Sequence, residues 1–100
     1  MENEIQHLFD YLKNSNCEFI RNGKWHNAEE AFKHLNKKYQ YLVKKGLIIS
    51  TEQFIDRAAS KSSMSGKPYL VKCGESGPIK SSVWLKSKLT RFREKTSSNR

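Results

Sequence analysis

The sequence predicts a single α+β domain in which four helices pack around a small antiparallel sheet. Two patterns predict this class. Apolar residues recur at helical spacing in four separate segments, and two short extended segments each carry a cysteine at one end. A third observation is the length, because 100 residues suffice for one hydrophobic core but not for a Rossmann fold or a TIM barrel. The domain is expected to cover residues 1–95, with a flexible tail at 96–100.

The first element is an amphipathic helix over residues 2–14. Its apolar residues stand at positions i, i+3, i+4 and i+7, on one helical face: Ile5, Leu8, Phe9 and Leu12. A β-hairpin follows, because Asn22 and Gly23 both tolerate the positive φ that a tight hairpin turn requires. The strands of this hairpin are expected at 18–21 and 24–26.

Two further helices come next along the chain. Asn27 and Glu30 form a capping-box pattern at the start of the longer helix, and Gly46 supplies its C-terminal stop. The inward face of this helix is expected to consist of Ala28, Ala31, Phe32, Leu35, Tyr39, Leu42 and Val43. Ser50 caps a short third helix. Its inward-facing residues are Phe54, Ile55, Ala58 and Ala59.

The rest of the chain holds a loop, a strand and a last helix. A polar loop spans 60–68, an apolar strand follows at 68–73, and residues 74–78 are a turn by composition. Ser81 or Ser82 then caps the last helix. Its expected buried stripe is Leu85, Leu89 and Phe92, with Val83 and Trp84 at the margin.

The two cysteines favour a disulfide between Cys17 and Cys73. Cys17 opens one extended segment and Cys73 closes the other, so antiparallel pairing of the segments would bring the sulfur atoms within bridging distance. A disulfide indicates an oxidising compartment. The alternative is two buried free thiols, the usual state in a cytosolic protein. With only two widely spaced cysteines, a tetrathiolate zinc site is excluded.

Positive charge accumulates toward the C-terminus of this chain, whose net charge is +9. Basic and acidic residues number one and four over 1–20, eight and four over 21–60, and ten and two over 61–100. In the last helix, helical spacing places four residues on one basic stripe: Trp84, Lys88, Arg91 and Lys95. Such a stripe suits an anionic lipid surface or stacking on nucleic-acid bases. The alternative is a solvated face that only aids solubility.

The loop at 60–68 contains a Ser-Gly-Lys-Pro sequence that is not a P-loop. Lys61 stands where the first glycine is required, and Pro68 replaces the Ser/Thr metal ligand. What remains is a candidate anion-binding loop beside Lys67, built from hydroxyls and backbone amides: Ser62, Ser63, Ser65 and Gly66. The alternative is a connector without a ligand.

The histidines and carboxylates do not form a recognisable catalytic or metal site. His7, His26 and His34 lie in different elements, none at the spacing of a metal-binding pair, and we expect them at the surface. No metal or cofactor is therefore expected. Enzymatic activity is the minority hypothesis, in the form of a small hydrolase using Arg21 and the loop from Ser62 to Lys67.

Five ordered segments resemble the YfeK-like family, small exported bacterial proteins of unknown function. The matching segments are Phe19 to Gly23, Ala31 to Leu35, Thr51 to Ile55, Ala59 to Tyr69, and Trp84-Leu85. They extend over nearly the whole domain, from about Glu4 to Arg93. The resemblance implies export to the periplasm or beyond, in agreement with a disulfide, and supplies no activity. The strongly basic last helix departs from the family pattern.

These observations together predict an exported, non-catalytic binding module, monomeric, whose basic C-terminal half engages an anionic surface. Phosphorylated or anionic lipid headgroups are the expected partner, reached by peripheral contact because no apolar stretch is long enough to span a membrane. The alternatives are a nucleic-acid or acidic-polysaccharide binder. The expected ligand-binding residues are Trp84, Lys86, Lys88, Arg91, Arg93 and Lys95, with Lys67 and Arg21 as secondary contacts. The chain carries no signal peptide, so it would represent the mature form of a periplasmic or secreted protein.

Overall fold

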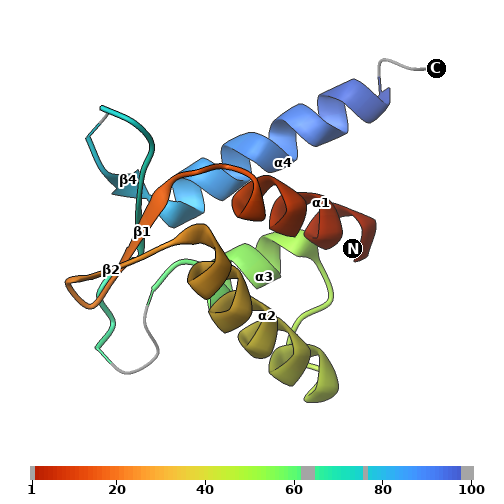
Figure 1. Cartoon of the computed structure of the whole chain (residues 1–100). Helices are drawn as coiled ribbons and strands as arrows, with labels where there is room; N and C mark the ends of the chain where they lie inside the picture. Colours follow the sequence, from red (N-terminus) through yellow and green to blue (C-terminus); the bar gives the residue numbers. More distant parts are fainter. Residues whose placement is uncertain (1, 62–64, 76, 98–100) are drawn as a thin grey trace.

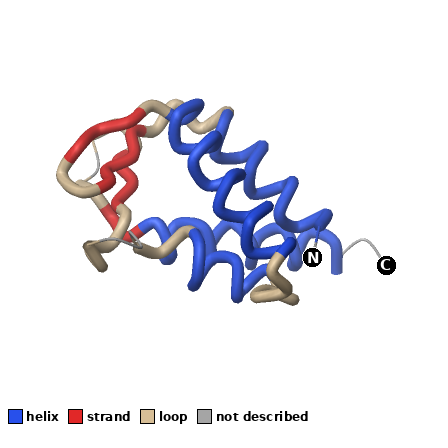
Figure 2. Tube along the Cα trace, turned by 90° about the horizontal axis from the view of Figure 1, so that it is seen from below, coloured by secondary structure: helices blue, strands red, loops and turns tan. Residues whose placement is uncertain are grey.

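The computed structural model describes residues 2–61, 65–75 and 77–97, and it has the expected α+β class (Figure 1). The helices are α1 (Glu2–Lys13), α2 (Ala28–Lys44), α3 (Thr51–Ala58) and α4 (Ser81–Ser97). The strands are β1 (Glu18–Arg21), β2 (Lys24–His26), β3 (Leu70–Lys72) and β4 (Ile79–Lys80). The small sheet lies at one end of the helices, and α2 runs away from it (Figures 1 and 2).

The strands form one antiparallel sheet in the order β2-β1-β3-β4. Its central pair joins β1 and β3, which are far apart in the sequence, with Glu18 opposite Lys72 and Phe19 opposite Val71. The β1–β2 turn has positive φ at Asn22 (54°) and at Gly23 (79°), which confirms the predicted hairpin. The buried side chains of Phe19 and Val71 attach the sheet to the helices.

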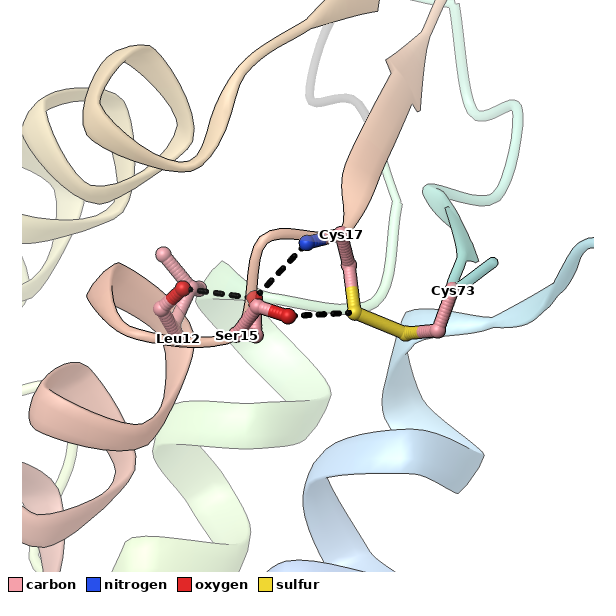
Figure 3. The surroundings of a disulfide bond; sticks show 4 residues. All are labelled: Leu12, Ser15, Cys17 and Cys73. Atoms are coloured by element: carbon pink, nitrogen blue, oxygen red, sulfur yellow. Dashed lines mark hydrogen bonds between the residues drawn. A yellow bond between two sulfur atoms is a disulfide. The ribbon is translucent and has the colours of Figure 1, made fainter.

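A disulfide joins Cys17 to Cys73 at the end of the central strand pair, as predicted (Figure 3). The two Cα atoms are 4.4 Å apart. Ser15 holds the chain between α1 and β1, because its Oγ donates to the Leu12 carbonyl oxygen at 2.8 Å and accepts from the Cys17 N–H at 3.2 Å. The disulfide therefore lies where the C-terminal end of α1 meets the sheet.

The hydrophobic core lies between the helices and continues to the sheet. α1 and α3 each contact both α2 and α4, so the four helices enclose a common interior. Phe9 stands at its centre, edge-on to the rings of Phe32, Tyr39 and Phe54. The expected capping box at Asn27 and Glu30 is present at the start of α2. No helix in the described segments is long and apolar enough to cross a membrane.

Three details differ from the sequence-based expectations. β4 was not expected, because the Pro78 region was interpreted as a turn leading directly into a helix. α4 continues to Ser97, so it includes the start of the expected tail, whose remainder (98–100) lies outside the described residues. Val43 was placed on the inward face of α2 but is exposed, because it lies in the last helical turn beyond the reach of the core.

Candidate anion-binding site

A half-enclosed pocket of about 320 Å³ lies between β1, α2 and α4. Most of its inner wall is apolar and comes from buried residues: Leu12, Phe19, Leu35, Trp84 and Leu85. Polar side chains line the rest, among them Arg21, His34 and Tyr69. A mostly apolar hollow with a few convergent polar groups is the usual form of a small-ligand site.

Arg21, His34 and Tyr69 meet because the sheet register and α2 bring them together. The pairs Phe19–Val71 and Ile20–Leu70 continue by one residue to place Arg21 opposite Tyr69. Arg21 Nη1 lies 2.9 Å from His34 Nδ1, and His34 Nε2 lies 3.0 Å from Tyr69 Oη. β1, α2 and the residue just before β3 thus contribute one side chain each to a single hydrogen-bonded cluster.

Lys38 completes this cluster from the next turn of α2. Its Nζ donates to Tyr69 Oη at 3.2 Å and to the Lys61 carbonyl oxygen at 3.4 Å, and it lies 5.2 Å from the centre of the Tyr69 ring. We call Arg21, His34, Lys38 and Tyr69 the donor cluster.

The donor cluster is rich in hydrogen-bond donors. Arg21 Nη1 faces both ring nitrogens of His34, at 2.9 Å from Nδ1 and 3.3 Å from Nε2, and a guanidinium can only donate. His34 Nε2 and Tyr69 Oη share a hydrogen bond whose donor is set by the tautomer of the ring. Tyr69 Oη also accepts from Lys38 Nζ. Arg21 and Lys38 have further N–H groups.

Partial burial and the neighbouring cations hold His34 in its neutral form. Partial burial, together with the nearby charges of Arg21 and Lys38, lowers the pKa of His34 to about 4. Burial also lowers the pKa of Lys38, and the Arg21 charge adds to this effect. Among the described residues no carboxylate forms an ion pair with Arg21 or Lys38. Glu30 lines the same pocket, but it caps α2 and faces His26 at 3.8 Å.

A second hollow, also of about 320 Å³, adjoins the cluster on the other side of His34. Its lining is basic and aromatic, and no carboxylate belongs to it: His34, Lys37, Lys38, Tyr41, Leu42 and Arg57. His34 lines both hollows. The positive surface therefore continues from the donor cluster along α2 to α3.

The polar loop after α3 packs beside the donor cluster. Ser65 Oγ donates to the side-chain oxygen of Asn22, the residue after Arg21, and accepts from the Lys67 N–H at 3.2 Å. Gly66 has a φ of 73°, and Lys67 is exposed. The structure thus brings Arg21, Ser65, Gly66 and Lys67 into one region, whereas Ser62 and Ser63 lie outside the described residues.

The α4 cations lie apart from this region, and several are held by intramolecular contacts. Arg93 donates to Glu4 and Glu52, each at 2.7 Å, and Lys86 pairs with Asp56 at 2.9 Å. Lys88 lies over the rings of Tyr11 and Trp84. Arg91 and Lys95 are exposed, as their place on the predicted basic stripe requires.

Trp84, expected at the margin of the buried stripe of α4 and as a ligand contact, lies in the core. Trp84 is only 7% exposed, because its ring packs edge-on against Tyr11 and Phe19 and fills space between α1 and the sheet. Trp84 and Lys88 do share an open hollow beside the disulfide, with Tyr11. The indole therefore cannot serve as a surface anchor without leaving the core.

Sequence reasoning missed three members of the donor cluster. His34 was expected at the surface, and Lys38 and Tyr69 were assigned no role, because their meeting depends on how α2 packs on the sheet. One signal was available: a disulfide between Cys17 and Cys73 implies the register that places Arg21 opposite Tyr69. In the described residues no three His, Cys, Asp or Glu side chains form a group that could hold a metal ion.

Comparisons with known proteins find relatives without an assigned activity. A family model described as a family of unknown function, DUF5329, matches residues 1–93. The uncharacterized protein YfeK of Salmonella typhimurium is 52% identical over 51 residues, which cover 51% of this chain and 41% of that protein. The match thus spans less than half the length of this relative. No solved structure matches.

Proposed function

The chain belongs to the DUF5329 family, whose function is unknown, and we propose that it is an exported, non-catalytic module that binds anionic headgroups, most favourably phosphorylated lipid headgroups. The donor cluster is the specific contact. The basic C-terminal half supplies long-range attraction through the exposed charges of α4. This assignment moves the centre of recognition from α4, where the sequence analysis placed it, to Arg21 and its neighbours.

One observation supports the proposal above the others: the donor cluster offers donors and two cations, and no carboxylate among the described residues is paired with those cations. An anion rich in acceptor oxygens satisfies such an array, and charge-assisted bonds of this kind are the stronger ones. A bound anion would also offset the repulsion between Arg21 and Lys38. A cationic or purely donating ligand would gain nothing there.

The apolar wall of the adjoining pocket favours an amphiphile over a free inorganic ion. Leu12, Phe19 and Leu35 line the space next to Arg21, so a ligand with an apolar part attached to its anionic group buries additional surface. The Cys17–Cys73 bond is compatible with a location outside the cytosol, where lipid headgroups are abundant.

The test measures binding of inorganic phosphate and, separately, of phosphatidylcholine vesicles containing phosphatidic acid. Arg21→Gln is expected to weaken both by about tenfold or more, because it removes a charged donor from the cluster. The control is Lys80→Gln, which removes the same charge from β4, an exposed strand at the other edge of the sheet. Its binding should match that of the unchanged protein.

A second comparison separates the two roles. Charge reversal of Lys88, Arg91 and Lys95 to Glu is expected to reduce vesicle binding steeply at low salt and to leave phosphate binding unchanged. Saturable phosphate binding whose affinity is unchanged by Arg21→Gln would refute the donor cluster as the site. Binding of single-stranded DNA or of an acidic polysaccharide, with none to vesicles, would replace the lipid proposal.

A further inference from the structure

We infer that the loop between α2 and α3 inserts an apolar tip into an anionic lipid bilayer. This inference deepens the proposed function and rests on it, since a headgroup ligand is what makes a bilayer the partner. The tip consists of Val43 from the last turn of α2 and of Leu47 and Ile49 from the loop, and it lies at the end of α2 that points away from the sheet (Figures 1 and 2).

Exposed apolar side chains concentrate at this tip. Ile49 is 81% exposed, more than any other large hydrophobic side chain in the described residues, and Leu47 and Val43 are 46% and 42% exposed. Tyr41, two residues before Val43, is also exposed. Between Leu47 and Ile49, Ile48 is buried and attaches the loop to the core. The loop is therefore a protrusion held in place from below, with its apolar side chains directed outward.

The backbone of the tip is already hydrogen-bonded within the protein. Gly46 N–H donates to the Val43 carbonyl oxygen at 3.0 Å and Leu47 N–H to that of Leu42 at 2.9 Å, which is a Schellman ending for α2. Ile49 N–H donates to Gln53 Oε1 at 2.8 Å, and the Leu47 carbonyl oxygen accepts from Arg57 at 2.6 Å. Unsatisfied backbone groups are the main obstacle to placing a loop in lipid, and these bonds remove much of it.

Cations surround the tip on the side of α2. Lys44 and Lys45 lie between Val43 and Leu47, and Arg57 reaches the Leu47 carbonyl oxygen from α3. His34, Lys38 and Tyr41 of α2 and its C-cap residue Lys45 fall on one helical stripe about 16 Å long, which connects the donor cluster to the tip. The carboxylate of Glu52, three residues after Ile49, is held by Arg93.

An anionic bilayer fits this arrangement better than a second copy of the chain does. Each copy would bring the same lysines to the contact, and the whole chain carries a charge of +9, so self-association through the tip opposes like charges. A bilayer offers negative headgroups to the lysines and an apolar interior to Leu47 and Ile49 at the appropriate depth.

The experiment places a tryptophan at the tip and measures its depth in the membrane. In a Trp25→Phe background, where Trp84 stays in the core, Ile49→Trp is compared with Val83→Trp, another exposed apolar position. Vesicles contain phosphatidylcholine and phosphatidic acid, with bromine atoms on the acyl chains as quenchers. We expect quenching of the tryptophan at 49 and none beyond background at 83.

Partitioning onto unbrominated vesicles of the same composition gives an independent readout. The double change Leu47→Ser and Ile49→Ser is expected to lower the partition coefficient about tenfold or more, whereas Ile79→Ser and Val83→Ser leave it unchanged. If circular dichroism shows that the double variant is unfolded, Ile49→Ser alone, at the most exposed position, replaces it in the partitioning measurement.

Each outcome decides the inference. Equal quenching at 49 and 83, or unchanged partitioning of the tip variants, overturns insertion. If inorganic phosphate still binds and Arg21→Gln still weakens it, the proposed function stands without insertion. If the tip is quenched while phosphate does not bind, the donor cluster fails and insertion stands. Concentration-dependent dimers abolished by Ile49→Ser would overturn insertion in favour of self-association.

Discussion

His34 is neutral in the folded protein because its ring is partly buried and because a proton on it would lie beside two cations. The guanidinium of Arg21 lies 2.9 Å from His34 Nδ1. His34 Nε2 and Lys38 Nζ both form a hydrogen bond with the hydroxyl of Tyr69. In the unfolded chain the His34 ring is solvated and away from these cations, so its pKa is near 6.5. One residue therefore links folding and ligand binding to pH.

Stability is expected to fall as the pH drops from about 6.5 to 4. In this window the unfolded state binds a proton on His34 that the folded state, with a pKa of about 4, does not. The contribution of neutral His34 to the free energy of unfolding is fully present above pH 6.5. Its loss on acidification amounts to at most about 3 kcal/mol. Urea unfolding at a series of pH values measures it. His34→Gln should flatten this part of the profile, and an unchanged slope would contradict the assignment.

Anion binding is expected to raise the pKa of His34. A negative charge beside the ring offsets the charges of Arg21 and Lys38, so protonation becomes easier in the complex than in the free protein. NMR titration of the imidazole with and without sulfate, whose charge is constant over this range, measures the shift. By linkage, sulfate affinity should rise between pH 7 and pH 5; affinity that falls over this range would argue against binding at the cluster.

At the scale of elements, α4 is attached to its neighbours through Arg93. The guanidinium bonds Glu4 of α1 at 2.7 Å and 3.1 Å and Glu52 of α3 at 2.7 Å and 3.1 Å. Hydrogen bonds from Arg93 lower the pKa of both carboxyl groups, that of Glu52 to about 2. Thr51 also donates to Glu4 at 2.6 Å, so three helices meet at this network.

Arg93→Gln is expected to lower the free energy of unfolding by about 1 kcal/mol, a modest value because the groups are partly solvated. Denaturant unfolding measures the change. The loss should shrink in high salt, where exposed charges are screened. Arg91→Gln serves as the control, because it removes an arginine from the same helix and leaves the bonds of Arg93 to Glu4 and Glu52 in place. Equal effects of the two variants would show that the network adds nothing beyond net charge.

At the scale of the whole molecule, one covalent bond closes most of the chain. Cys17 and Cys73 are 56 residues apart, and a loop of this size contributes about 4 kcal/mol when the effect is assigned to the entropy of the unfolded chain. The double change Cys17→Ala and Cys73→Ala should lower the free energy of unfolding by about this amount in urea. Adding a reductant should destabilise the unchanged protein and leave the double variant unaffected; a stable reduced protein would contradict this.

Local patterns in the sequence predict most of the fold. The Asn22-Gly23 turn, the Asn27 cap and the apolar face of α1 depend on residues close in the sequence, and all three are present. β4 was missed because it has only two residues, and Ile79 and Lys80 pair with β3 rather than forming a local pattern. Short edge strands of this kind depend on a partner strand.

The candidate site was less predictable because it is assembled from distant residues. Arg21 was identified from its charge, but Tyr69 lies 48 positions later and approaches it only through the β1–β3 register. For Trp84, the helical stripe correctly places it beside Lys88 but cannot show that Tyr11 and Phe19 cover its ring. Periodicity determines which residues share a face, and packing determines whether that face is exposed.

The position of the disulfide also decides how the molecule responds to mechanical tension. α1 precedes Cys17 and α4 follows Cys73, so a force that pulls these two helices apart passes from one strand to the other through the sulfur atoms. The residues between the cysteines carry none of this load. Arg21, His34, Lys38 and Tyr69 all lie within that covalent ring. Stretching would therefore pull α1 and α4 out of the core while the binding residues remain under no direct force.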